Sequence, residues 1–73
     1  MTNTNLLKEL INRKGLKMGF IAEQLGISYQ CLKNKIDNVR EFKASEIDIL
    51  CKLLDVFSLK QKEQLFFAQQ VDK

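Results

Sequence analysis

Two cysteines are the side chains of this sequence best suited to nucleophilic chemistry, and neither has a partner for it. Cys31 and Cys51 lie twenty residues apart and form no CxxC pattern. The chain contains no histidine, so the commonest general base and zinc ligand is missing. We expect a buried Cys51 and a partly exposed Cys31, both free thiols in a reducing cytoplasm. The sequence therefore predicts no enzyme activity, no metal site and no cofactor.

Polar side chains suited to binding gather in one short segment instead. Residues 28–36 read SYQCLKNKI, in which Leu32 and Ile36 recur at helical spacing and Ser28 is a favourable N-cap residue. With the two apolar residues facing inward, four hydrogen-bonding side chains point outward: Tyr29, Gln30, Lys33 and Asn34.

Helices are expected throughout the chain, including the one that carries these side chains. Apolar residues recur at three and four rather than at two, which predicts an all-α fold. We expect a first helix ending at Gly15, then helices at about 17–25, 29–36, 44–54 and 59–70, the last with Ser58 as its N-cap. At 73 residues the chain forms a single domain, 1–73, because domains usually hold about 100–150 residues.

The spacing within residues 20–36 is more specific than amphipathicity. Ala22, Gly26, Ile27, Leu32 and Ile36 are in register with a helix-turn-helix at about residues 17–36: a small residue where two helices touch, a glycine in the turn, and apolar residues that hold the second helix. Two unrelated short helices can also share a glycine turn, so this alternative stays open.

The segment LKMGFIAEQLGISYQCLKNKIDNVREF, residues 16–42, resembles the five-helix, lambda repressor-like DNA-binding domain of the Cro/CI helix-turn-helix group. It looks most similar to small Cro-like proteins of phages of Gram-positive bacteria, over about residues 5–70. The resemblance implies a phage or prophage transcription regulator in the bacterial cytoplasm. Three positions depart from the group: Met18 replaces a usual glutamine, Phe20 a polar residue, and Asn38 a common glycine.

In a helix-turn-helix the second helix lies in the major groove of double-stranded operator DNA and the first crosses the backbone. The base-contacting candidates are then Tyr29, Gln30, Lys33 and Asn34, of which Gln30 is the strongest, because amides pair with adenine and lysine with guanine. The phosphate-contacting candidates flank this helix: Lys17, Met18 through its backbone, Ser28, Asn38, Arg40 and Lys43. All of these types also occur as ordinary solvent-facing residues.

The charge of the chain is concentrated around the same segment. The net charge is +3. Residues 13–43 hold seven basic and three acidic residues, a local +4, whereas residues 44–73 hold four basic and five acidic ones. This segregation favours an anionic partner such as DNA.

Proteins of this design usually bind DNA as dimers, because one such module covers only half of an operator. Apolar residues near the C-terminus are in excess of what one helix face buries, which makes Val56, Phe57, Phe66 and Phe67 candidates for a dimer or partner interface. The alternative is that these aromatic residues fill a small core.

Two other functions remain open. An antirepressor would bind a companion phage repressor instead of DNA, and Met18, Phe20 and Tyr29 would suit such a protein surface. An antitoxin is a weaker alternative. The apolar runs are at most four residues long, too short for the roughly 18–20 residues of a membrane span, so no membrane partner is expected.

Overall fold

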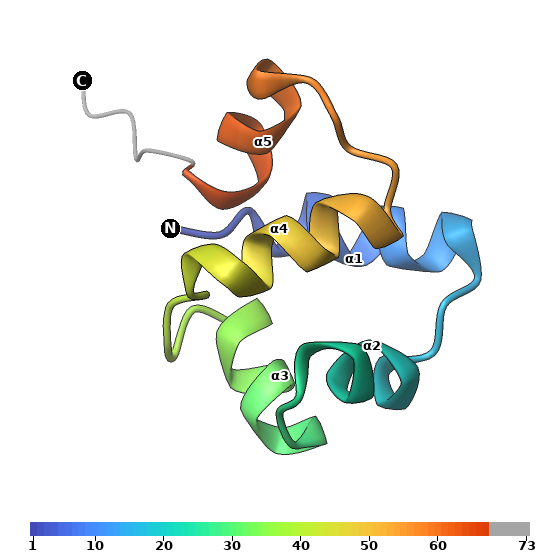
Figure 1. Ribbon diagram of the computed structural model, residues 1–73. Coiled ribbons are helices and arrows are strands. Elements are labelled where there is room, and N and C mark those ends of the chain that lie inside the picture. Colours follow the sequence, from blue (N-terminus) through green and yellow to red (C-terminus); the bar gives the residue numbers. More distant parts are fainter. Residues whose placement is uncertain (68–73) are drawn as a thin grey trace.

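The computed structural model describes residues 1–67, which form five α-helices and no β-strand. The helices are α1 (Thr4–Lys14), α2 (Met18–Leu25), α3 (Tyr29–Ile36), α4 (Ala44–Leu53) and α5 (Leu59–Phe66). The predicted all-α class is thus confirmed for the described part of the chain. Figure 1 shows α5 at the end of the molecule opposite to α2 and α3.

Local signals in the sequence explain where most helices begin. The side chains of Asn3, Ser28 and Ser58 each accept a hydrogen bond from a backbone N–H in the first turn of the helix that follows. These bonds satisfy donors that have no partner inside the helix. The predicted caps Ser28 and Ser58 are therefore confirmed.

Helix ends agree with the sequence where a glycine marks them. Gly15 and Gly26 follow α1 and α2 in the left-handed region, at φ 69° and 71°, as expected for glycine at this position. Helix α5 ends at Phe66, with Phe67 as its C-cap at a non-helical φ of −127°. The expected extension of this helix to about residue 70 falls on residues 68–70, which lie outside the described part of the chain. No glycine or proline marks that end, so the amphipathic pattern alone could not locate it.

One apolar core is shared by all five helices. Each contributes two residues that are almost completely buried, and the turn between α4 and α5 adds Leu54 and Val56. Helix α2 packs against α3 and α4, while α1 packs against α3 and α5. As a result α3 is held from two sides.

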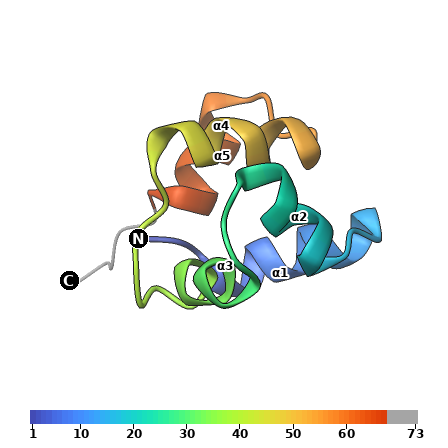
Figure 2. The same ribbon diagram turned by 60° about the horizontal axis from the view of Figure 1, so that its bottom comes forward.

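The N-terminal residues close the fold across the sequence. The backbone N–H of Asn3 donates to the carbonyl oxygen of Leu65 at the end of α5, 2.7 Å away. On its other side the same segment contacts the loop between α3 and α4, and Figure 2 shows this loop passing beside the N-terminus. The first residues thus connect the end of α3 to the end of α5.

Candidate nucleic-acid interface

Helix α3 is fixed by its inward face and by its first turn. Leu32 and Ile36 are 0% and 1% exposed, as the sequence predicted. Ser28 Oγ accepts a hydrogen bond from Cys31 N–H at 3.0 Å and so caps the helix. The left-handed Gly26 lets the chain reverse between α2 and α3 within residues 26–28. The orientation of the outward face therefore follows from buried packing.

The four candidate base-contacting residues do share that outward face. Tyr29, Gln30 and Lys33 are exposed and Asn34 is half-buried. Gln30 Nε2 donates to Asn34 Oδ1 at 3.1 Å, one turn apart. This contact leaves Gln30 Oε1 as an acceptor and Asn34 Nδ2 as a donor on neighbouring side chains, a combination that could pair with the edge of a base.

The start of α2 has unused hydrogen-bond donors. Its N-cap, Lys17, has extended dihedral angles and makes no side-chain capping bond. The first N–H groups of α2, beginning at Met18, therefore lack the side-chain acceptor that α1, α3 and α5 possess. Such a helix terminus favours an anion, both through its free N–H groups and through the helix dipole.

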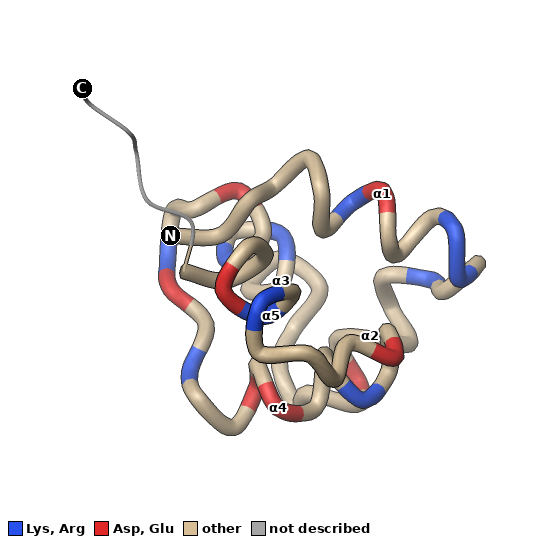
Figure 3. Tube along the Cα trace, turned by 90° about the horizontal axis from the view of Figure 1, so that it is seen from above, with Lys and Arg blue, Asp and Glu red and all other residues tan. Residues whose placement is uncertain are grey.

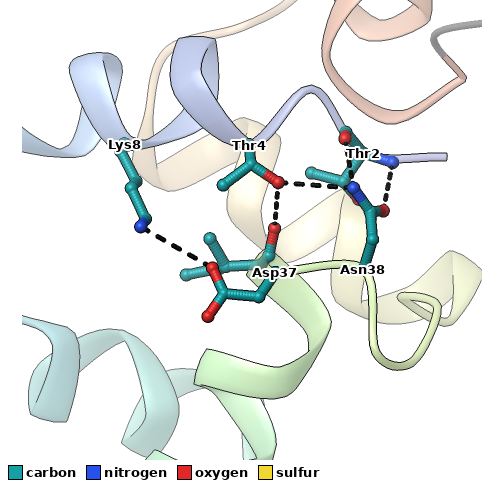
Figure 4. Close-up of polar contacts among 6 residues, drawn as sticks. Thr2, Thr4, Lys8, Asp37 and Asn38 are labelled. Atoms are coloured by element: carbon teal, nitrogen blue, oxygen red, sulfur yellow. Dashed lines mark hydrogen bonds and ion pairs between the residues drawn. The ribbon is translucent and has the colours of Figure 1, made fainter.

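Asn38 is exposed, and its side chain also makes contacts within the chain. It adopts a left-handed φ of 65°, and its side chain accepts from Thr2 N–H and donates to Thr2 O, each at 2.8 Å. Figure 4 shows this two-way contact beside Thr4, whose hydroxyl donates to Ile36 O at 2.5 Å. Asn38 thus binds the N-terminal segment in a left-handed conformation that asparagine tolerates, and a phosphate contact at Asn38 stays a prediction.

No sequence pattern predicts Thr2 and Thr4 as the partners of this loop. They lie more than thirty residues away from Asn38 and Ile36, and no local pattern links residues at that separation. Thr2 is nevertheless buried.

Lys35 is turned away from solvent. Its ammonium group lies 2.5 Å from Glu46 Oε1, and the two side chains are 6% and 7% exposed. The same oxygen accepts the backbone N–H of Lys43 at 2.8 Å. Burial acts to raise the pKa of Glu46, but the hydrogen bonds and charges of Lys35 and Lys43 outweigh it and lower that pKa below its usual value.

The local excess of positive charge is consequently smaller than the sequence suggested. Three of the seven basic residues of segment 13–43 pair with acids outside it: Arg13 with Glu9, Lys14 with Asp55, and Lys35 with Glu46. Four have no ion-pair partner within residues 1–67: Lys17, Lys33, Arg40 and Lys43. Figure 3 shows blue at the junction of α1 and α2, and both signs in the loop after α3.

The candidate partner interface divides into two exposed and two buried residues. Phe57 and Phe67 are 70% and 57% exposed. Val56 and Phe66 are buried, and Phe66 packs edge-on against Phe42 with ring centroids 5.7 Å apart. Val56 and Phe66 therefore belong to the core of the chain and offer no surface to a partner.

The two thiols differ as expected. Cys51 is buried, which raises the pKa of its thiol, and Cys31 is half-buried. No cluster of three metal-ligating side chains occurs in residues 1–67. None of the helices there has the length and apolar character that crossing a bilayer requires.

Comparison with models of protein families, with curated proteins and with solved structures finds no match to this chain.

Proposed function

We propose that this protein is a sequence-specific DNA-binding transcription regulator of the Cro/CI helix-turn-helix group that its sequence resembles. In this proposal α3 enters the major groove of operator DNA, and α2 crosses the backbone. The observation that carries the proposal is the outward face of α3, where Tyr29, Gln30, Lys33 and Asn34 are presented together by a helix whose opposite face is buried.

The surroundings of α3 support the proposal because they offer groups suited to phosphates. The N–H groups at the start of α2, which no side chain caps, would take the place of the glutamine side chain that Met18 replaces. Lys17, Arg40 and Lys43 are exposed and flank the helix, and the hydroxyl group of Ser28 lies at its N-terminus. These contacts would position the protein on DNA without reading its sequence.

The same proposal includes dimerisation on DNA. One α3 reads one half-site, and a two-fold dimer would place the second about one helical turn away. Of the interface candidates, Phe57 and Phe67 retain the exposed apolar area that such a contact needs. The protein would bind and do no chemistry.

The test is DNA binding by the purified chain. Gel-shift titrations with the DNA that flanks its own gene should give a sequence-specific complex whose affinity falls steeply with salt, because phosphate contacts release counterions. Gln30→Ala should cost about 1–3 kcal/mol of specific binding. Gln61→Ala is the matched control, since Gln61 is exposed on α5, far from α3 in sequence and in the fold. No complex at low salt would refute the proposal.

One observation favours a second candidate, an antirepressor that binds a companion repressor protein. Phe20 on α2 and Tyr29 on α3 are 43% and 55% exposed, and apolar area of this kind suits a protein partner better than a phosphate backbone. Co-purification of the chain with a repressor encoded beside it, together with an absence of DNA binding by the chain alone, would decide for this function.

A further inference from the structure

A cavity of about 320 Å³ opens between α1, the start of α2 and α3. This volume is at the lower end of the roughly 300–1,000 Å³ of small-molecule sites. Apolar and charged side chains of α1, α2, α3 and the segments beside them line it. The proposed DNA binding assigns no role to this cavity.

The lining separates into an apolar wall and a basic rim. Ile11 and Ile36 belong to the buried core, and Leu16 and Met18 pack partly buried against it. Two lysines and one aspartate supply the charge of the rim. Their sum is positive, so an occupant with an apolar body and a negative group would match both parts.

The two lysines are not equivalent. Lys8 Nζ lies 3.6 Å from Asp37 Oδ1, and Figure 4 shows it reaching from α1 toward the end of α3. Lys33 is exposed and has no ion-pair partner within residues 1–67. An anion would therefore meet the unpaired ammonium group of Lys33. The ammonium group of Lys8 could also interact with the anion, because its contact with Asp37 is long at 3.6 Å.

We propose that this cavity binds a small amphipathic carboxylate, aromatic or branched aliphatic, with its apolar body against Leu16 and Met18 and its carboxylate at the lysine rim. Tyr29 and Lys33 line the cavity and also belong to the outward face of α3. An occupant therefore competes with DNA for these two side chains. This last step rests on the proposed function, whereas binding of the carboxylate does not.

The first experiment uses the full chain without DNA and 2-naphthoate as the probe. Titration followed by amide chemical shifts should give saturable changes confined to the lining residues. The neutral analogue 2-naphthylmethanol should bind about two- to fivefold more weakly, the range expected for a solvent-exposed ion pair. Absence of saturation, equal binding of the neutral analogue, or shifts scattered over other surfaces would each overturn the proposal.

A pair of variants ties the result to the rim. Lys8→Gln leaves Asp37 without its cation and should weaken naphthoate binding severalfold relative to the wild-type chain. Lys52→Gln is the matched control, because Lys52 is an exposed lysine in an ion pair with Asp48 on α4, outside the cavity. Neither residue is placed on the DNA-binding face. Equal loss in both variants would contradict the assignment of the site.

The second experiment adds the probe to the DNA complex. Naphthoate should raise the apparent dissociation constant for DNA in the wild-type chain, and less so in Lys8→Gln. Binding of naphthoate with unchanged DNA affinity would overturn the competition. A chain that binds naphthoate but no DNA would refute the proposed function while supporting the carboxylate site, so the two failures are distinguishable.

Discussion

Glu46 receives two hydrogen bonds at a single carboxylate oxygen, one from the ammonium group of Lys35 and one from the backbone N–H of Lys43. The first joins the last turn of α3 to α4, and the second holds the N-terminus of α4 in the manner of half a capping box. Both ends of the loop that carries Arg40 therefore depend on this one side chain.

Loss of the Glu46 carboxylate should destabilise the fold strongly. In Glu46→Gln the buried ammonium of Lys35 loses its counter-charge, and we expect the free energy of unfolding to fall by about 3–5 kcal/mol. Asp48→Asn is the control, since the ion pair of Asp48 with Lys52 is exposed and contributes about 0–1 kcal/mol. Urea unfolding followed by circular dichroism measures both. Equal, small effects would show that the buried pair contributes nothing.

The same carboxylate should make stability depend on acid pH. The pKa of Glu46 lies below its ordinary value of 4.5 in the folded chain, so on acidification the unfolded chain takes up the proton first. The stabilisation is therefore complete above pH 4.5 and is lost as the pH falls through the folded pKa. Unfolding free energies of wild type and Glu46→Gln should converge in the acid range. Curves that stay parallel there would exclude Glu46 as the cause.

At the scale of elements, the two left-handed positions around α3 are filled by different residues for different reasons. Gly26 precedes α3 at φ 71° and has no side chain that could form a contact. Asn38 follows α3 at φ 65°, and its side chain binds Thr2. The turn before α3 requires only conformational freedom. The turn after α3 also requires a side chain that binds the N-terminal segment.

Alanine substitutions at Gly19, within α2, and at Gly26, directly after it, should change the stability of the fold in opposite directions. Gly26→Ala places a Cβ at a left-handed φ and should destabilise the fold by about 1–2 kcal/mol. Gly19→Ala lies inside α2, where the added Cβ meets no atom within 4 Å, and should stabilise by about 0.5–1 kcal/mol. Thermal unfolding of the two variants checks the pair. A Cβ at position 26 also meets no atom within 4 Å, so an unchanged stability of Gly26→Ala would contradict the role given to its left-handed φ.

At the scale of the whole molecule, the first residues join elements that the sequence separates widely. Met1, Thr2 and Asn3 contact Phe66, Asn38 and Leu65 respectively through backbone or terminal groups. Since α1 also packs against α3 and α5, the C-terminal helix and the proposed DNA-reading helix share one support. A change in the packing of α5 is therefore expected to reach the end of α3.

Two adjacent phenylalanines have different environments: Phe66 lies in the core, and Phe67 lies on the surface that we propose as an interface. Phe66→Ala removes a ring that is 4% exposed and should cost about 3–5 kcal/mol of unfolding free energy. Phe67→Ala removes a ring that is 57% exposed and should change stability by no more than about 0.5 kcal/mol. If Phe67 lies in the dimer contact, the second variant should instead weaken self-association.

Chemical denaturation and sedimentation equilibrium measure these two effects separately. A Phe67→Ala variant with unchanged self-association and unchanged DNA binding would remove this residue from the interface. A stable Phe66→Ala variant would contradict the burial of that ring.

Local sequence patterns predicted several features of the fold. The helices, the caps Ser28 and Ser58, the left-handed glycines and the inward side of α3 were predictable, because each depends on residues within about one or two turns of helix. The same spacing separated Tyr29, Gln30, Lys33 and Asn34 from the core. The end of α5 was not predictable, since no residue type there stops a helix.

Contacts between residues distant in the chain followed from the packing of the helices and could not be predicted from local patterns. This packing buried Lys35 against Glu46, turned Asn38 toward Thr2, placed Val56 and Phe66 in the core, and opened the cavity beside Tyr29. A lysine, an asparagine or a phenylalanine has the same local propensity whether it faces solvent or another helix. Periodicity therefore determined which helices form and which faces they bury, while long-range packing alone determined which of the remaining side chains are free to bind.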